Sequence, residues 1–170
     1  MRAFQIFQQA PPELAAQIIE YLRGEEKQAY NGILGSLAKE RKLRPVFVQR
    51  KTAQDQVQWM HETLKLKGSD EIAEHLLQIW LLKAHTPMLV RFLDKLGIQH
   101  DGEGAVDDLP EELDEKKLKS AVNGLLKKYP QPVVWTYLNL FQLQRSGGWD
   151  GLTALLEEDE RLATPVVTES

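Results

Sequence analysis

The side chains best suited to chemistry are a histidine and a run of carboxylates in the second half of the chain. Residues 101–115 contain no Lys or Arg and eight acids: Asp101, Glu103, Asp107, Asp108, Glu111, Glu112, Asp114 and Glu115. His100 directly precedes them. Neighbouring carboxylates raise one another's pKa, which suits acid–base chemistry, and their oxygens bind hard cations. Residues 100–112, which we call the acidic loop, are therefore the candidate site of a metal-dependent enzyme or binder.

The spacing inside the acidic loop does not match a known ligand pattern. With Asp101 as the first ligand of an EF-hand, Ala105 takes the fifth position, and Val106 stands where that loop requires glycine. The other three histidines lack the spacing to a second histidine or an acid that helical metal sites use. No serine has the context of a nucleophile elbow, and cysteine is absent. We therefore predict no resident metal and no cofactor, and the balance is against an enzyme.

Positive charge gathers earlier, between residues 39 and 51. This basic segment contains one acid, Glu40, and six cations: Lys39, Arg41, Lys42, Arg44, Arg50 and Lys51. Phe47 lies among them, and basic residues interleaved with an aromatic can hold a nucleic-acid backbone and stack a base. The same residues also suit a solvated helix end, because cations complement the C-terminal dipole. The overall charge of −4 favours this second explanation, so nucleic acid is the weaker alternative as a partner.

The two charge runs give the halves of the chain opposite signs. Residues 1–100 have a net charge of +3 and residues 101–170 a net charge of −7. Each run repels itself and attracts the other, so we expect them to meet within one chain or across a weak homodimer. The candidate partner-binding residues are Arg41, Lys42, Arg44, Arg50, Lys51, His100, Asp101, Asp107 and Asp108.

Helices must position these residues, because apolar side chains recur at three- and four-residue spacing along most of the chain. The pattern predicts eight helices: 11–24, 26–42, 52–67, 70–84, 87–96, 111–128, 131–143 and 149–162. Residues 98–110 are expected to be irregular, with Asp107 or Asp108 capping the helix that follows. Residues 4–6 and 46–48 could form short strands, but an isolated pair is marginal and helical ends are favoured.

One internal similarity bears on packing. Residues 81–94 align with residues 125–139, and both read as a helix, a turn punctuated by proline and a second helix. Their offset of 44 to 45 residues resembles the helix pairs of HEAT and armadillo repeats, a likeness that carries no functional residues. We predict one all-α domain over residues 1–163, with about eight helices packed as antiparallel hairpins in a loosely solenoid-like way. A short flexible tail, residues 164–170, follows.

Composition narrows the class of protein. A chain of 170 residues without cysteine is neither a disulfide-stapled scaffold nor a carrier of cysteine-ligated metal. Its longest aliphatic and aromatic run, Ile79–Leu82, is far too short to span a membrane. The glutamine-punctuated stretch after Arg2 leads us to expect no signal peptide. The four tryptophans are assigned to packing, with Trp149 expected to be the least buried. We expect a cytoplasmic, non-catalytic helical interaction or scaffold module with an unidentified protein partner and no membrane association.

Overall fold

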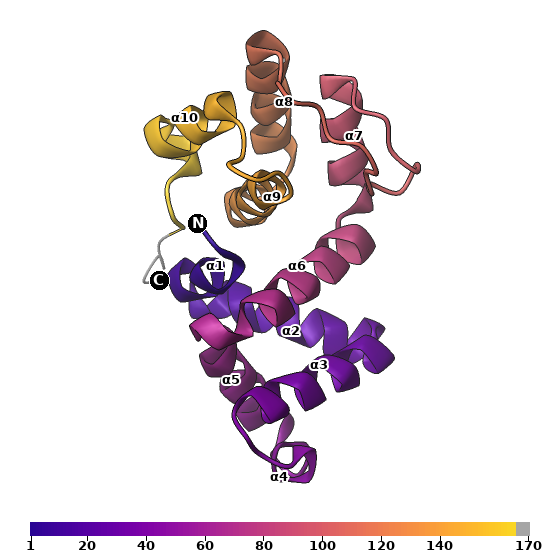
Figure 1. Ribbon diagram of the computed structural model, residues 1–170, viewed down its shortest axis with the longest axis vertical. Coiled ribbons are helices and arrows are strands. Elements are labelled where there is room, and N and C mark those ends of the chain that lie inside the picture. Colours follow the sequence, from indigo (N-terminus) through magenta and orange to yellow (C-terminus); the bar gives the residue numbers. More distant parts are fainter. Residues whose placement is uncertain (166–170) are drawn as a thin grey trace. The chain divides into compact units, whose positions relative to one another are not determined.

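The computed structural model describes residues 1–165, which form ten α-helices and two 3-10 helices and contain no β-strand (Figure 1). The all-α prediction is therefore confirmed. The described chain divides into two compact units, residues 1–80 and 81–165, and α6 (Asp70–Ala84) contributes to both. The single-domain organisation stays a prediction, and most of the expected tail lies outside the described residues.

Unit 1 is built around α2, whose buried residues Leu14, Ile18 and Leu22 recur every four positions. This helix packs against both α3 and α5, while α1 packs against α5 and the 3-10 helix η1, and α4 packs against α3. The remaining elements of unit 1 besides α6 have these bounds: α1 (Ala3–Gln9), α2 (Pro12–Glu25), α3 (Lys27–Glu40), α4 (Pro45–Gln49), α5 (Ala53–Leu64) and η1 (Lys67–Ser69).

The two helices beyond the predicted eight are α1 and α4, which contain the residues that could have been strands. The helical interpretation of both segments is confirmed. Pro45 opens α4 at a position where its missing N–H costs no hydrogen bond, and Val48 anchors that helix by burial. At α1, Asp70 forms an ion pair with Arg2 and accepts a hydrogen bond from the Phe4 N–H at 3.2 Å. A carboxylate from α6 thus satisfies the first turn of α1.

Unit 2 is built around α9, which is buried along most of its length and packs with α8, α10 and η2. Helices α7 and α8 lie side by side (Figure 1). Both aligned segments form a helix, a turn and a helix, with Pro87 and Pro132 in the first turns of α7 and α9. The elements after α6 have these bounds: α7 (Thr86–Leu96), α8 (Glu115–Lys128), α9 (Gln131–Leu143), α10 (Asp150–Glu158) and η2 (Glu160–Leu162).

The predicted start of α8 is wrong by about one turn. The helix begins at Glu115, because the Asp114 carboxylate accepts the Lys117 N–H at 2.9 Å and caps it. Asp107 and Asp108 instead lie in the irregular segment before it. The last predicted helix is also shorter than expected, since α10 ends at Glu158 and η2 follows as a separate turn.

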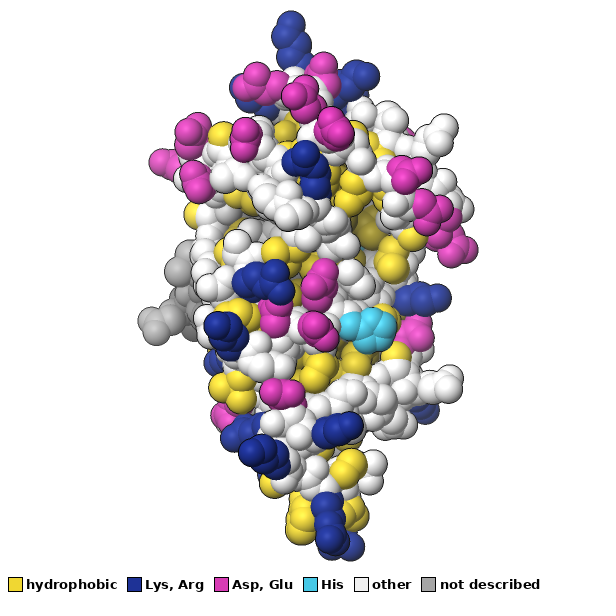
Figure 2. Space-filling view, viewed as in Figure 1, with side chains coloured by type: hydrophobic (Ala, Val, Ile, Leu, Met, Phe, Trp, Pro, Cys, Tyr) yellow, Lys and Arg dark blue, Asp and Glu magenta, His cyan; other side chains and the backbone are white. Residues whose placement is uncertain are grey.

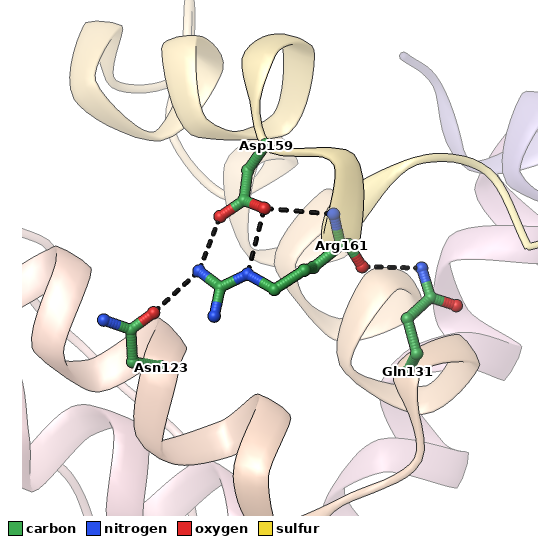
Figure 3. Close-up of polar contacts among 4 residues, drawn as sticks. All are labelled: Asn123, Gln131, Asp159 and Arg161. Carbon is green, nitrogen blue, oxygen red and sulfur yellow. Dashed lines mark hydrogen bonds and ion pairs between the residues drawn. The ribbon is translucent and has the colours of Figure 1, made fainter.

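A polar cluster fixes η2 to the rest of unit 2 (Figure 3). Arg161 binds both carboxylate oxygens of Asp159 and donates to Asn123 of α8 at 2.7 Å. From α9, the Gln131 amide donates to the Arg161 carbonyl at 3.0 Å. The hydrogen bonds from Arg161 hold the pKa of the Asp159 carboxyl below its usual value. These contacts give Asp159 and Arg161 a structural role at the end of the described chain.

Candidate functional site

The basic segment, residues 39–51, forms one end of unit 1, and we call it the basic tip. It comprises the end of α3, the turn after it, α4 and the turn that leads to α5. Figure 1 places α4 at the extremity of unit 1, and Figure 2 shows hydrophobic and basic side chains gathered together there. The two kinds of side chain therefore share one surface.

Three apolar side chains of the basic tip face solvent. Leu43 is 40% exposed, Val46 39% and Phe47 59%, whereas Val48 is fully buried. The five-residue α4 packs against α3, and Val48 alone among its residues is buried. Gln56 of α5 also donates to the Val48 carbonyl at 3.1 Å. The other apolar residues of α4, Val46 and Phe47, stay outside. Exposed apolar side chains that cluster in this way mark interaction surfaces more often than single ones do.

The six cations of the basic tip are all exposed, and they fall into two groups. Arg41 packs within unit 1, because its guanidinium lies 5.9 Å from the centroid of the Trp59 ring and Nη1 donates to Thr63 Oγ1 at 3.3 Å. The other five form no ion pair or side-chain hydrogen bond within the described part of unit 1: Lys39, Lys42, Arg44, Arg50 and Lys51. Five positive charges are thus available to an external anion.

The turn between α3 and α4 depends on an unusual backbone conformation at Lys42. Its φ is 56°, the left-handed region that favours glycine. The N–H of Lys42 donates to the Lys39 carbonyl at 2.9 Å, and that of Leu43 donates to the Ala38 carbonyl at 2.8 Å. These hydrogen bonds end α3 in the way that is usual when a glycine follows a helix. A residue with a side chain pays about 1–2 kcal/mol for the left-handed conformation. The chain keeps a cation at a position where its backbone is strained.

The acidic loop is organised by two of the residues singled out from the sequence. His100 Nδ1 accepts the Gly102 N–H at 3.0 Å, so Nε2 carries the proton and donates to Asp94 Oδ1 at 2.7 Å. Asp101 Oδ1 accepts the N–H groups of Glu103 and Ala105 at 2.8 and 3.1 Å. These backbone hydrogen bonds hold the pKa of the Asp101 carboxyl below its usual value. Both side chains therefore have local structural roles.

The structure brings His100, Asp107 and Asp108 to one pocket of about 500 Å³, together with Glu112 and Asp114, while Asp101 lies outside its lining. Among residues 1–165, no three His, Asp or Glu side chains come together as a metal ion would require. The metal-dependent alternative at the acidic loop stays a prediction, and no observed geometry supports it.

Two residues outside the candidate site residues named from the sequence hold the acidic loop in place. Gly104 has a φ of 99°, and a Cβ there would lie 2.8 Å from Cβ of Leu89 on α7. Glycine is therefore required both by conformation and by the close approach of the loop to α7. The only sequence signal for it was a fragment with two glycines around Glu103.

Trp149 is the second residue, and the expectation that it is the least buried tryptophan is wrong. Its side chain is 3% exposed, its ring stacks on Phe141 at a centroid distance of 4.8 Å, and Nε1 donates to the Pro110 carbonyl at 3.0 Å. Trp59, which is half-buried beside Arg41, is the least buried instead. Trp149 thus fixes the C-terminal end of the acidic loop, a contact between residues far apart in sequence.

Comparison of the chain with protein-family models, with curated proteins and with solved structures found no match. Over residues 1–165, every helix is too short or too polar to cross a lipid bilayer. Of the two sites described above, only the basic tip exposes both charge and large apolar side chains.

Proposed function

We propose that this chain is a non-catalytic helical interaction module that binds an anionic surface through the basic tip. The observation that carries the proposal is the exposure of Leu43, Val46 and Phe47 among five cations that have no ion pair within the described part of unit 1. A protein as the partner and a cytoplasmic location stay predictions from the sequence.

The electrostatics of the basic tip favour such a role. Cations without an internal ion pair lose no partner when an external anion approaches them. Six positive charges within thirteen residues also create a local field that raises the rate of encounter with a polyanion, although the whole chain is acidic. Binding of this kind weakens with salt, because counterions screen exposed charges beyond a Debye length of about 10 Å at 0.1 M.

The test is retention on immobilised heparin, a polyanion that has no apolar chains. The double variant Arg44→Glu, Arg50→Glu reverses two charges of the basic tip. The matched control Lys116→Glu, Lys117→Glu changes the net charge by the same amount at exposed positions in the first turn of α8, where acids suit the helix dipole. We expect the wild type and the control to be retained at about 50 mM salt and to elute as salt rises, and the tip variant to pass through.

The proposal is contradicted if the wild type passes through the heparin column at low salt. Equal retention of the wild type and the tip variant would contradict it as well, because the binding surface would then lie elsewhere. Far-UV circular dichroism of each variant shows whether its helices remain intact.

A further inference from the structure

We propose that the anionic partner of the basic tip is the headgroup surface of a phospholipid bilayer, into which Phe47 inserts. The inference rests on the proposed function and names the class of partner for the same surface. It concerns docking onto one face of a membrane and does not involve a spanning segment. It also departs from the expectation that the chain has no membrane association.

Apolar side chains accompany the cations of the basic tip. A bilayer surface presents negative charge and, directly beneath it, an apolar layer that accepts side chains to a depth of about 5–10 Å. A nucleic acid also presents negative charge, but its bases offer faces for stacking, which suits Phe47 and leaves Leu43 and Val46 without a role. The three exposed apolar side chains together match the layered chemistry of a membrane.

The apolar surface of the basic tip is small. A stable interface between proteins buries about 800 Å² on each partner, with an apolar core at its centre. The basic tip offers three partly exposed side chains around a five-residue helix, which is little for such a core. A bilayer requires no matching shape, and each Lys or Arg near an anionic surface multiplies the affinity by about five. Several cations with a small apolar insertion therefore suffice at a membrane.

Helix α4 and the turn before it fix the position of the exposed residues of the basic tip. Val48 holds α4 on α3, and the left-handed turn at Lys42 joins the two helices. Both features lie at the extremity of unit 1, where cations and apolar side chains occur together (Figure 2). With five residues, α4 is too short to bind as an amphipathic helix lying in the interface. Insertion of the end of unit 1, with Phe47 leading as its most exposed large apolar residue, fits the geometry better.

The test is flotation of the protein with vesicles of phosphatidylserine and phosphatidylcholine, compared with vesicles of phosphatidylcholine alone. We expect the wild type to float with the anionic vesicles at low salt and to remain unbound with the neutral ones. Phe47→Ala should lower the partition constant about tenfold, because it removes the largest and most exposed of the inserted apolar side chains. Phe47→Trp should restore binding, since tryptophan favours the membrane interface. Leu66→Ala, at another exposed apolar residue of unit 1, is the matched control and should bind as the wild type does.

Three outcomes would overturn the inference. Failure to float with anionic vesicles, while retention on heparin still requires Arg44 and Arg50, would leave the proposed function standing without this partner. Flotation that Phe47→Ala does not weaken would show that no insertion occurs. Tighter, Phe47-dependent binding to a single-stranded oligonucleotide than to the anionic vesicles would assign the basic tip to nucleic acid. Loss of heparin retention in the wild type would instead remove the proposed function itself.

Discussion

Two residues, Lys42 and His61, occupy positions that are unfavourable for their residue type. Lys42 adopts a positive φ that a glycine would adopt at lower cost, and its exposed side chain adds a charge to the basic tip. His61 is buried between α5 and α1, where a charged imidazole is disfavoured. Each residue leads to a prediction that one substitution can check.

Replacing Lys42 should raise stability and weaken binding at the same time. We expect Lys42→Gly to increase the free energy of unfolding by about 1 kcal/mol, because it relieves the left-handed conformation, and to lower the salt concentration at which heparin releases the protein. The matched control Lys39→Gly removes a cation from the helical end of α3 and should decrease stability by about 0.5–1 kcal/mol. Urea denaturation measures both. Equal destabilisation by the two changes would contradict the turn described here.

The pH dependence of stability should report on His61. Its Nε2 donates to the Phe7 carbonyl at 3.2 Å, but burial outweighs this bond and lowers the pKa of the imidazole below 6.5. The unfolded chain therefore binds the proton more readily than the folded chain. The contribution of His61 to the free energy of unfolding is complete above about pH 6.5 and decreases as the pH falls below that value. Burial lowers the pKa of His85 as well, so part of the loss belongs to unit 2.

We expect His61→Gln to reduce the loss of unfolding free energy between pH 7 and pH 5, measured by urea denaturation at each pH. His75→Gln removes an exposed histidine and serves as the control, which should keep the loss seen in the wild type. An unchanged acid response in His61→Gln would show that His61 is not buried in solution.

At the scale of elements, periodicity predicts the helices that have a continuous apolar stripe between clear boundaries. The predicted bounds of α6 and α9 match the structure. Helix α7 begins within a residue of its predicted start and ends before Gly97, because Pro87 and Gly97 mark its two ends. The start of α8 could not be read in this way. Seven acids of the run precede it, and the local pattern allows several of them to cap it. The structure uses Asp114, which follows the segment that Trp149 fixes at Pro110.

The candidate surfaces are likewise only partly predictable from the sequence. The cations of the basic tip can be named from the sequence, because charge runs need no tertiary information. The exposure of Leu43 and Val46 cannot, because apolar residues next to a predicted helix are expected to be buried, and their exposure depends on how the short α4 rests on α3. The local hydrogen bonds of His100 and Asp101 also follow from loop geometry that no spacing rule describes.

The contact between Trp149 and Pro110 should hold the end of the acidic loop. Trp149→Phe keeps an aromatic ring to stack on Phe141 and removes the N–H donor, so we expect a loss of about 1 kcal/mol in unfolding free energy. Amide hydrogen exchange over residues 107–114 should become faster. Trp59→Phe, at the half-buried tryptophan of unit 1, is the control and should leave exchange in that segment unchanged. Unchanged exchange in Trp149→Phe would contradict the role of this contact.

At the scale of the whole molecule, charge is divided between the two units. The basic tip belongs to unit 1 and the acidic loop to unit 2, in keeping with the opposite net charges of the two halves of the sequence. Charge runs of opposite sign attract, and exposed ion pairs contribute only about 0–1 kcal/mol each. Any self-association through these runs should therefore be weak and sensitive to salt.

Sedimentation velocity can test the homodimer expected from the charge runs. Pairing of the runs between two copies, as opposed to pairing within one chain, predicts a weak dimer at about 50 mM salt that dissociates at about 0.5 M, where the Debye length shortens to about 4 Å. Arg44→Glu, Arg50→Glu should abolish it, and Lys116→Glu, Lys117→Glu should preserve it. A monomer at every salt concentration would exclude the dimer, and a dimer that persists at 0.5 M would have to rest on apolar contacts.

We expect the basic tip, and no other part of residues 1–165, to meet the anionic partner. Amide correlation spectra of the ¹⁵N-labelled protein, recorded during titration with a heparin hexasaccharide, test this claim residue by residue. At a protein concentration at which the chain is monomeric, we predict that chemical-shift changes concentrate in residues 39–51, that they vanish in Arg44→Glu, Arg50→Glu, and that the signals of residues 100–112 stay in place. Changes centred on the acidic loop, or spread evenly over both units, would contradict the account.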